Sequence, residues 1–396
     1  MKALIPVISL LIIAVSSCVD PFYLELEDFE NRLVVEALIT DELAPNTIKL
    51  SRTFQDKDAS LDLLENAQVS VRDELGVISV FHEYQPGIYL SDSTSFRGRI
   101  GGTYTLSILT DDGLEFISTP STMSAVPAID SVYYELDSEI FETGTVEEAG
   151  LRIFLDAENQ DTPSDYLRWE FEEVWEFRVP NPILSQDLGF KKYKTGTAKN
   201  DICWRYEQSK QILIHSTADQ DGELMRRKPI HFIASAKSDR LLRQYSIQLS
   251  QYSISREEFL FWEKLKEITE SEGDIFEKQP FHIAGNISCI NAENVNVLGF
   301  FSVSAVKQKR IYITKSQIDD LDMPPFEYPC ERIIYPNRVL HELLYNNLLS
   351  DGYVLFYVEE SEFPGPPVNF QFTSIECADC TLSGKPEKPA FWVDMD

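Results

Sequence analysis

The chain has 396 residues and is strongly acidic, with 65 Asp and Glu against 35 Lys and Arg and a formal net charge of -30. Nucleic acids and anionic lipid surfaces attract clustered basic residues, so we expect no nucleic-acid partner and no flat contact with an anionic membrane. The hydrophobic content of 43% is that of a globular chain, and the length predicts two or three domains around sizeable cores.

The first eighteen residues predict export and a lipid anchor. Lys2 precedes an apolar run (residues 3–15), and small residues come just before Cys18. This is the pattern of a secretory signal peptide, and the run is too short for a permanent membrane span. Its end resembles the bacterial lipobox, in which the signal is removed before a cysteine that then becomes acylated. We therefore predict a signal peptide at residues 1–17 and membrane attachment through lipid on Cys18; an ordinary signal peptide is the alternative.

The next segment reads as a tether followed by a small β domain. Residues 18–31 are acidic and carry few turn signals, which suits an extended tether. Short alternating strands follow, and Asp111-Asp112-Gly113 predicts a hairpin turn between two of them. A stretch rich in Ser, Thr and Pro begins at Ser118. We predict a β-sandwich over residues 32–126.

Residues 127–396 are predicted to form a larger, strand-rich domain with one or two short helices. In residues 167–177 the odd positions are apolar except Glu173 and the even ones are mainly charged, which predicts a strand with one buried and one wet face. Ser255 followed by Glu258 predicts a capping box and a helix that ends near Gly273. A second helix, without clear caps, is predicted over residues 337–349. The fold class is therefore mainly β.

Several segments, taken in order, carry a family resemblance. They are Cys18-Val19-Asp20-Pro21, residues 33–41, Pro86-Gly87-Ile88-Tyr89, residues 97–106, Gly285-Asn286-Ile287, Leu298-Gly299-Phe300-Phe301, Cys377-Ala378-Asp379-Cys380 and residues 388–392. In these segments the chain resembles the Bacteroidota outer-membrane lipoproteins grouped as domain-of-unknown-function family 4249. The first region is also similar to the small sandwich of carboxypeptidase regulatory-like domains. The resemblance implies an extracytoplasmic lipoprotein, often encoded beside a TonB-dependent outer-membrane transporter, without established catalytic residues.

No spacing in the chain predicts a catalytic or metal site. The histidines are scattered and none has a zinc-binding neighbour: His82, His215, His231, His282 and His341. Ser304 and Lys307 match an acylating Ser-x-x-Lys spacing, but the segment reads as a strand, which would send them to opposite faces. Residues 156–161 hold acidic groups without the glycine and terminal Glu of a calcium loop. We therefore expect no resident metal or cofactor.

The cysteines predict disulfides, because an exported chain meets oxidising conditions. Besides Cys18 there are five, which leaves at least one unpaired: Cys203, Cys289, Cys330, Cys377 and Cys380. The pair at 377 and 380 is not followed by a helix start, which argues against a thioredoxin-like redox site. We predict a structural disulfide either within this motif or from it to Cys330, with a metal site as the alternative.

These features favour a non-enzymatic accessory lipoprotein that binds a ligand or a TonB-dependent transporter at the outer membrane, with the acidic tether favouring display on the cell surface. Trp169, Trp175 and Trp262 are candidate ligand platforms, although the periodicity of all three favours core positions. An envelope hydrolase of unfamiliar type and a structural envelope protein are the alternatives.

Overall fold

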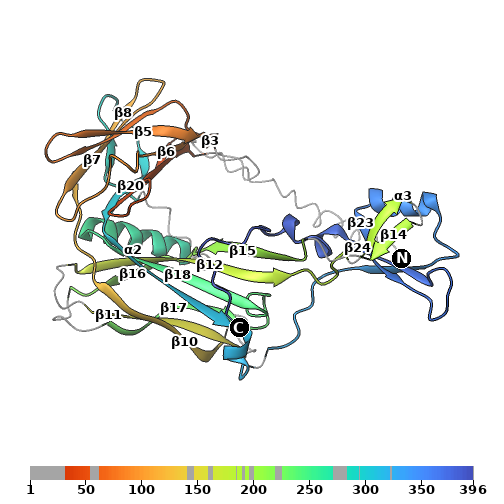
Figure 1. The fold of residues 1–396 in the computed structure, drawn as a ribbon. Coiled ribbons are helices and arrows are strands. Elements are labelled where there is room, and N and C mark those ends of the chain that lie inside the picture. The colour runs from red at the N-terminus through yellow and green to blue at the C-terminus, as the bar shows by residue number, and fades with distance from the viewer. Residues whose placement is uncertain are drawn as a thin grey trace, which may run out of the picture.

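The structure is a computed structural model, and it describes residues 32–53, 62–140, 147–158, 164–183, 185–189, 192–195, 200–218, 225–270, 283–293, 295–321 and 323–395. The predicted signal peptide, Cys18 and the tether lie outside the described residues. Strands account for 49% of the residues and helices for 11%, so the predicted mainly β class is confirmed. Figure 1 shows three parts: a first β domain, a larger second β domain beneath it, and a small C-terminal lobe that projects from the second domain.

The first domain is an eleven-stranded, nearly closed barrel-like sheet. Its central path runs β19-β8-β7-β4-β5-β6-β2-β1-β20, with β3 beside β2 and β9 beside β7. The strands are β1 (Leu33–Thr40), β2 (Thr47–Arg52), β3 (Asp62–Leu63), β4 (Gln68–Asp73), β5 (Ile78–Gln85), β6 (Ile88–Leu90), β7 (Thr103–Leu109), β8 (Glu115–Ser118), β9 (Ser121–Thr122), β19 (Ile287–Cys289) and β20 (Val297–Ser304). The predicted hairpin at Asp111–Gly113 joins β7 to β8.

Alternation along these strands explains the barrel core. In β1 the side chains of Leu33, Val35, Ala37 and Ile39 point inward and are buried, whereas Glu36 faces out. β4 and β7 alternate in the same way, so each strand supplies one apolar row to the interior. The barrel therefore has a continuous core, and its outward face is free to contact the second domain.

Two strands of this barrel come from far along the chain. The sequence patterns placed residues 287–304 in the second domain, but β19 pairs with β8, and β20 pairs in parallel with β1. Parallel neighbours need a long crossover connection, and here the whole second domain up to the end of α2 lies between β1 and β20. Local alternation cannot reveal such a pairing because it reports only which face of a strand is buried.

The second domain packs two sheets face to face. One holds β10 (Ala128–Ile140), β11 (Glu147–Glu158) and β17 (Met225–Ala234); the other holds β12 (Tyr166–Arg178), β15 (Ile202–Gln208), β16 (Leu213–Ser216), β18 (Gln244–Ser253) and β21 (Val306–Thr314). Figure 1 shows the first of these sheets below the second. Buried side chains from both, including Leu151, Ile153, Trp169 and Ile247, belong to one hydrophobic core. A 3-10 helix, η1 (Lys315–Ile318), follows β21.

The even positions of β12 were predicted to face water, but part of this face is buried. The residues at even positions include Arg168 and Val174, and both are buried. Helix α2 (Arg256–Glu270) packs over the part of β12 that carries Arg168, and the side chain of Trp392 packs with Val174. Tertiary cover on the second face therefore overrides the local alternation.

Both helices predicted from sequence are present. Ser255 caps α2 as predicted, since its Oγ accepts a hydrogen bond from the backbone N–H of Glu258 at 3.1 Å. The second helix, α3, covers Glu342–Ser350 and starts later than predicted, because a turn from Pro336 precedes it and His341 caps it. None of the described helices has the length and hydrophobicity that crossing a membrane requires.

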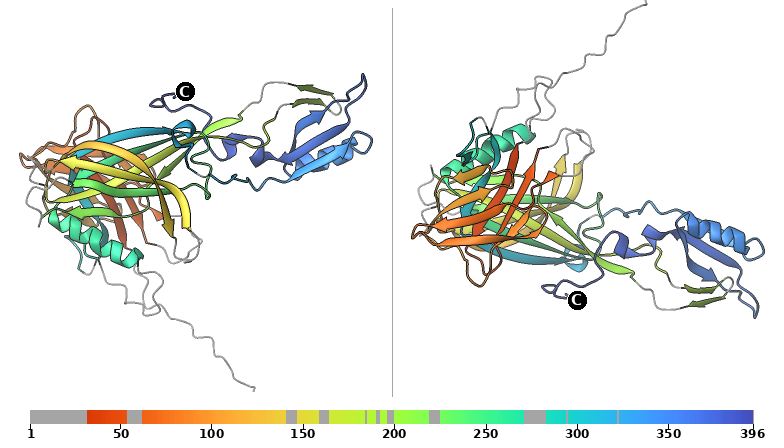
Figure 2. Two further views of the ribbon diagram at one scale, coloured as in Figure 1. Left: turned by 90° about the horizontal axis from the view of Figure 1, so that it is seen from below. Right: turned by 90° about the horizontal axis from the view of Figure 1, so that it is seen from above.

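The C-terminal lobe (residues 331–376) has a small core of its own. Its sheet runs β22 (Arg332–Pro336), β24 (Asn369–Ser374), β23 (Tyr353–Glu359), and α3 packs on it around Tyr345, Leu348 and Phe372. The hairpin of β13 (Ser185–Gly189) and β14 (Lys192–Thr195) lies against β23. Figure 2 shows the lobe extending away from the two larger domains on a narrow connection.

Candidate functional site

The cysteines form two disulfides where the lobe joins the second domain. Cys377 pairs with Cys330 and Cys380 pairs with Cys203, at Cα–Cα distances of 6.0 and 5.6 Å. The predicted bond from the motif to Cys330 is therefore confirmed, whereas a bond within the motif is wrong: Cys377, in the 3-10 helix η2 (Ile375–Cys377), bonds to the segment before β22, and Cys380, in the 3-10 helix η3 (Cys380–Leu382), bonds to β15. Cys289 is unpaired among the described cysteines.

We call these two disulfides, Cys330–Cys377 and Cys203–Cys380, the clasp. Cys330 and Cys377 stand at the two ends of the lobe, so their bond closes it into a loop, and the bond from Cys380 to Cys203 fixes that loop to β15. The half-cystines that lie in β15 and η3 are fully buried. Their position in the interior supports a structural role for the motif.

The histidines do not come together. His82 is exposed on β5, His215 lies on β16 and His341 caps α3. His231 forms an ion pair with the carboxylate of Glu173, and His282 lies outside the described residues. Within the described part of the chain no group of three or more His, Cys, Asp or Glu side chains could hold a metal ion.

Of the three candidate tryptophans, two fill cores and one faces a cleft. Trp169 and Trp175 are 1% and 5% exposed, and their Nε1 atoms donate to Gln251 and Asp239, each at 2.9 Å. Trp262, on α2, is only partly buried and lines the cleft between the two β domains. The tertiary structure thus separates a candidate platform from two core residues of the same type.

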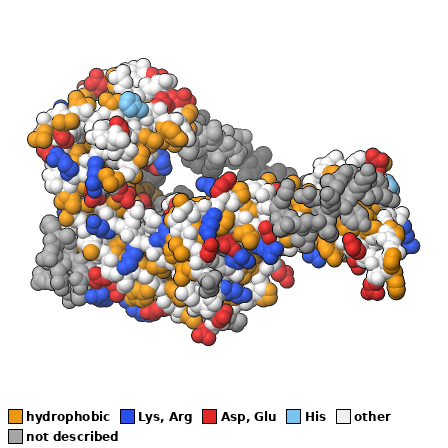
Figure 3. Space-filling model, viewed as in Figure 1, with side chains coloured by type: hydrophobic (Ala, Val, Ile, Leu, Met, Phe, Trp, Pro, Cys, Tyr) orange, Lys and Arg blue, Asp and Glu red, His pale blue; other side chains and the backbone are white. Residues whose placement is uncertain are grey.

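This interdomain cleft has a volume of about 980 Å³. One wall is the outward face of β2, β1 and β20, where Val34, Leu38 and Phe300 project beside Glu36 and Lys49. Figure 3 shows the surface hollowed where the first domain stands on the second. The size falls in the range of sites for small molecules, and such sites commonly lie at domain interfaces.

The opposite wall comes from α2 and the start of β12. Phe261, Trp262 and Leu265 line it from the helix, and Arg168 lines it from the strand. The guanidinium of Arg168 lies over the rings of Tyr252 and Trp262, at 5.0 and 4.7 Å from their centroids. Its Nη1 pairs with Glu170 at 2.5 Å. An apolar cleft therefore has one buried, aromatic-stacked cation in its wall.

Glu258 joins the two walls of the cleft. The sequence predicted that its side chain would complete the capping box, but Oε1 accepts hydrogen bonds from Ser302 Oγ of β20 at 2.7 Å and from Trp262 Nε1 at 3.1 Å. The residue is 1% exposed, and this burial raises the pKa of its carboxyl. This side chain therefore links the helix of the second domain to a strand of the first.

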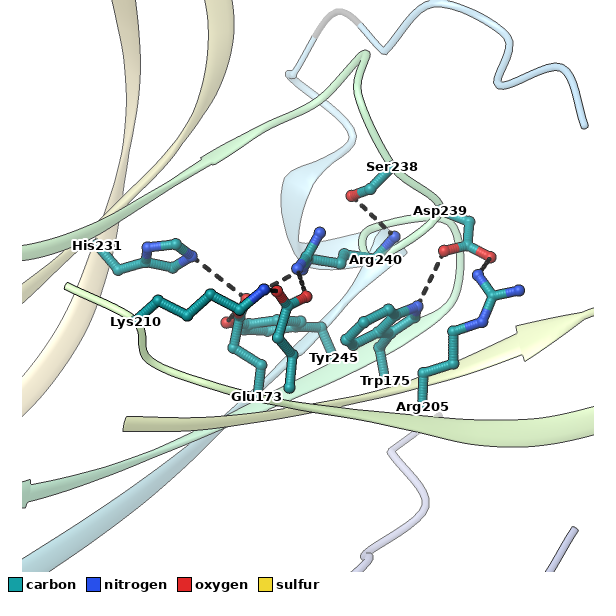
Figure 4. A network of polar contacts seen from close by, with 10 residues as sticks. Glu173, Trp175, Arg205, Lys210, His231, Ser238, Asp239, Arg240 and Tyr245 are labelled. Carbon is teal, nitrogen blue, oxygen red and sulfur yellow. Dashed lines mark hydrogen bonds and ion pairs between the residues drawn. The ribbon is translucent and has the colours of Figure 1, made fainter. Parts of the chain in front are cut away.

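A second polar group is buried between the two sheets of the second domain. Glu173, 2% exposed on β12, accepts a hydrogen bond from Tyr245 Oη at 2.8 Å and forms ion pairs with His231 Nε2 and Arg240 Nε at 3.3 and 3.2 Å. Figure 4 shows these groups converging on the carboxylate from β17, from β18 and from the loop between those strands. Burial alone would raise the pKa of Glu173, but His231, Arg240 and Tyr245 outweigh it and hold the pKa below its usual value.

The same loop ties the second domain to the base of the lobe. Asp239 accepts hydrogen bonds from Trp175 Nε1 at 2.9 Å, from Arg205 Nη1 at 2.8 Å and from Tyr328 Oη at 2.7 Å (Figure 4 shows the first two). Tyr328 belongs to the segment that leads into the lobe. Burial is the main cause that raises the pKa of Tyr328, and the hydrogen bond to Asp239 raises it further. The three donors to the buried carboxylate of Asp239 come from β12, from β15 and from the segment that leads into the lobe. We therefore interpret this network as a support for the fold.

Comparison with known proteins places this architecture in a family. The family described as "Domain of unknown function (DUF4249)" has a model that matches residues 19–310. The chain belongs to the DUF4249 family. No curated protein matches the chain in a sequence search. The DUF4249 match includes the barrel, α2 and both walls of the cleft, whereas the lobe and the clasp cysteines 330, 377 and 380 lie beyond it.

Two of the resemblance segments meet where the DUF4249 barrel closes. A Cβ atom on Gly299 would lie 1.9 Å from the carbonyl oxygen of Val35, and the φ of Gly299 is +104°. A Cβ on Gly285 would lie 1.8 Å from the carbonyl oxygen of Gly299. Both positions need glycine because backbone approaches backbone there. The close backbone contact therefore explains why the segments at 285–287 and 298–301 each contain a glycine in this chain.

Neither the cleft nor the polar network was predicted from the sequence, although the polar network had a signal there. Glu173 is the charged residue among the otherwise apolar odd positions of its strand, and a charged side chain that is buried requires partners. Arg168, in contrast, occupies one of the even positions, which were predicted to face water. Its burial depends on α2, so nothing in its own strand indicated it.

Proposed function

We propose that this protein is an outer-membrane lipoprotein that binds a ligand in its interdomain cleft and serves as a non-enzymatic accessory of a TonB-dependent transporter. The observation that carries the proposal is the cleft itself: about 980 Å³, lined mainly by apolar side chains and set between two domains. Such a site can bind without chemistry, and closure of one domain on the other is a familiar way to retain a ligand.

Two observations support the proposed lipid anchor. The lipobox-like sequence ends at Cys18, and the two disulfides are typical of proteins that fold in oxidising compartments outside the cytoplasm. Several acyl chains would then hold the protein firmly at the membrane, since each buried methylene adds about 0.8 kcal/mol.

Metabolic labelling with a palmitate analogue tests the anchor. The wild-type protein should take up the label and sediment with outer membranes, and Cys18→Ala should abolish both. Cys289→Ala removes the unpaired thiol and is the matched control, which should label normally. Label that persists in Cys18→Ala would refute lipidation at this residue.

The partner and the face of the membrane have separate tests. After gentle solubilisation and crosslinking, a TonB-dependent transporter should co-purify with the lipoprotein; isolation of the lipoprotein alone would contradict the partnership. Protease treatment of intact cells should digest a surface-displayed protein. Digestion only after lysis would place it in the periplasm.

A further inference from the structure

Most of the side chains that line the interdomain cleft are apolar. On the barrel wall Val34 lies beside Leu298, because β1 and β20 pair in parallel register there. On the opposite wall Leu265 and Ile268 follow Phe261 by about one and two turns of α2, so these side chains line the cleft from one side of the helix. Contact with the two walls removes apolar ligand surface from water, and that removal favours binding.

Charged side chains of the lining are engaged within the protein. Lys49 pairs with Glu36 at 3.5 Å, and Arg168 Nη1 pairs with Glu170 at 2.5 Å. Arg32 also has an interaction of its own. Because neighbouring charges of opposite sign largely cancel at the distance of a ligand, this lining favours neither an anionic nor a cationic ligand.

Arg168 in particular offers little to a ligand anion. Its guanidinium stacks on the rings of Tyr252 and Trp262, and its Nε is buried, so a ligand in the cleft cannot reach that donor. The carboxylates of Glu170 and Glu258 both interact with its charge. The positive charge is therefore compensated from inside the protein.

Polar atoms where α2 meets β20 are also used by the protein itself. Ser302 Oγ and Trp262 Nε1 both donate hydrogen bonds to Glu258, at 2.7 and 3.1 Å. The second carboxylate oxygen of Glu170 accepts a hydrogen bond from Tyr252 Oη at 3.3 Å. A charged ligand group that bound to these atoms would have to replace existing hydrogen bonds, whereas an apolar group leaves them intact.

We propose that the interdomain cleft binds an uncharged, apolar small molecule, and that apolar contact rather than charge supplies the affinity. The proposal rests on the cleft being the binding site, as stated above, and adds the chemical class of the ligand. The volume of about 980 Å³ suits a small molecule rather than a folded partner.

Titration calorimetry on the purified mature protein tests the class with 1-octanol, 1-nonanol and 1-decanol, each within its aqueous solubility. The affinity should rise about fourfold with each added methylene group, because each one buries more apolar surface. Absence of binding, or an affinity that does not depend on chain length, would overturn the proposal.

Two ions of the same chain length, decanoate and decylammonium, test the absence of a charge preference below their micelle-forming concentrations. Both should bind more weakly than 1-decanol, because each brings a hydrated charge to an apolar wall without gaining a partner there. Tighter binding of either ion than of the alcohol would contradict an uncharged ligand.

Two substitutions of opposite charge, one on each wall, locate the site. Leu265→Asp on α2 and Leu298→Lys on β20 should each weaken the binding of 1-decanol about tenfold or more, since a charge of either sign opposes the burial of an apolar ligand. Leu343→Asp, at an exposed position of α3, is the matched control and should bind like the wild type. Unchanged binding in both wall variants would place the ligand elsewhere. Circular dichroism checks folding, and if neither wall variant folds, the probes on the wild type still decide the class.

The failure of this proposal can be told apart from failure of the proposed function. Acylation at Cys18 and co-purification with a transporter do not depend on the chemistry of the ligand. A lipoprotein that passes those tests but prefers decanoate or decylammonium keeps its proposed role and loses only the ligand class.

Discussion

The side-chain amide of Asn286 makes both backbone hydrogen bonds of Phe301. Its Oδ1 accepts from the backbone N–H of Phe301 at 2.8 Å, and its Nδ2 donates to the carbonyl oxygen of the same residue at 2.9 Å. One side chain thus replaces a neighbouring strand at the point where β19 and β20 approach each other. The barrel closes through this amide and the two glycines beside it.

Asn286→Asp tests that closure. An aspartate can still accept from the N–H of Phe301, but it cannot donate to the carbonyl and repels it. We expect a loss of about 2 kcal/mol in the free energy of unfolding, measured by urea denaturation. Asn346→Ala, at an exposed position of α3, is the control and should not lower it. Equal stability of Asn286→Asp and the wild type would show that the barrel closes without this amide.

Glu258 predicts a pH dependence of the link between the domains. Because its pKa in the folded protein is raised by burial, folding favours the protonated form. The stabilising contribution is therefore complete below the unfolded pKa of about 4.5 and is lost as the pH rises through the folded value.

Glu258→Gln should consequently be more stable than the wild type at pH 8, with a difference that shrinks towards pH 4, as measured by melting temperature. Glu263→Gln, an exposed glutamate on the same helix, is the matched control and should show no such trend. A Glu258→Gln variant that loses stability most strongly at high pH would reverse the assignment.

Glu173 predicts the opposite pH dependence. Its pKa in the folded protein is lowered, so its contribution is present above about pH 4.5 and is lost as the pH falls through the folded value. Glu173→Gln removes the charge that faces His231 and Arg240, and we expect it to cost about 3 kcal/mol at pH 7 in denaturant unfolding. The exposed Glu115→Gln is the control. A cost below about 0.5 kcal/mol would mean that this buried network contributes little.

The clasp predicts separate effects for its two disulfides. Cys203→Ser with Cys380→Ser should release the lobe from β15 and leave its own ends joined, so limited proteolysis should cut the connecting segments and spare the lobe. Cys330→Ser with Cys377→Ser should instead make the lobe itself sensitive. Each pair should cost about 2–5 kcal/mol of stability, and identical digestion patterns would contradict the division of roles. Mass spectrometry of unreduced peptides checks the pairing first.

Local features of the sequence determined much of the secondary structure. Alternating residues predicted the strand around Trp169, Ser255 predicted the start of α2, and the cysteine composition predicted disulfides with at least one thiol left over. These signals depend on residues that are close together along the chain. Such residues are also close together in space, so the pattern is visible in the sequence.

Only the tertiary structure decided which elements meet. The parallel pairing of β1 with β20, the choice of Cys203 as the partner of Cys380, and the link from Glu258 to Ser302 all join residues distant in sequence. A periodic pattern indicates that a face is buried but not what covers it, because apolar burial is non-directional. The cleft and the buried Arg168 therefore arise from the way the two domains pack, and no local pattern encodes them.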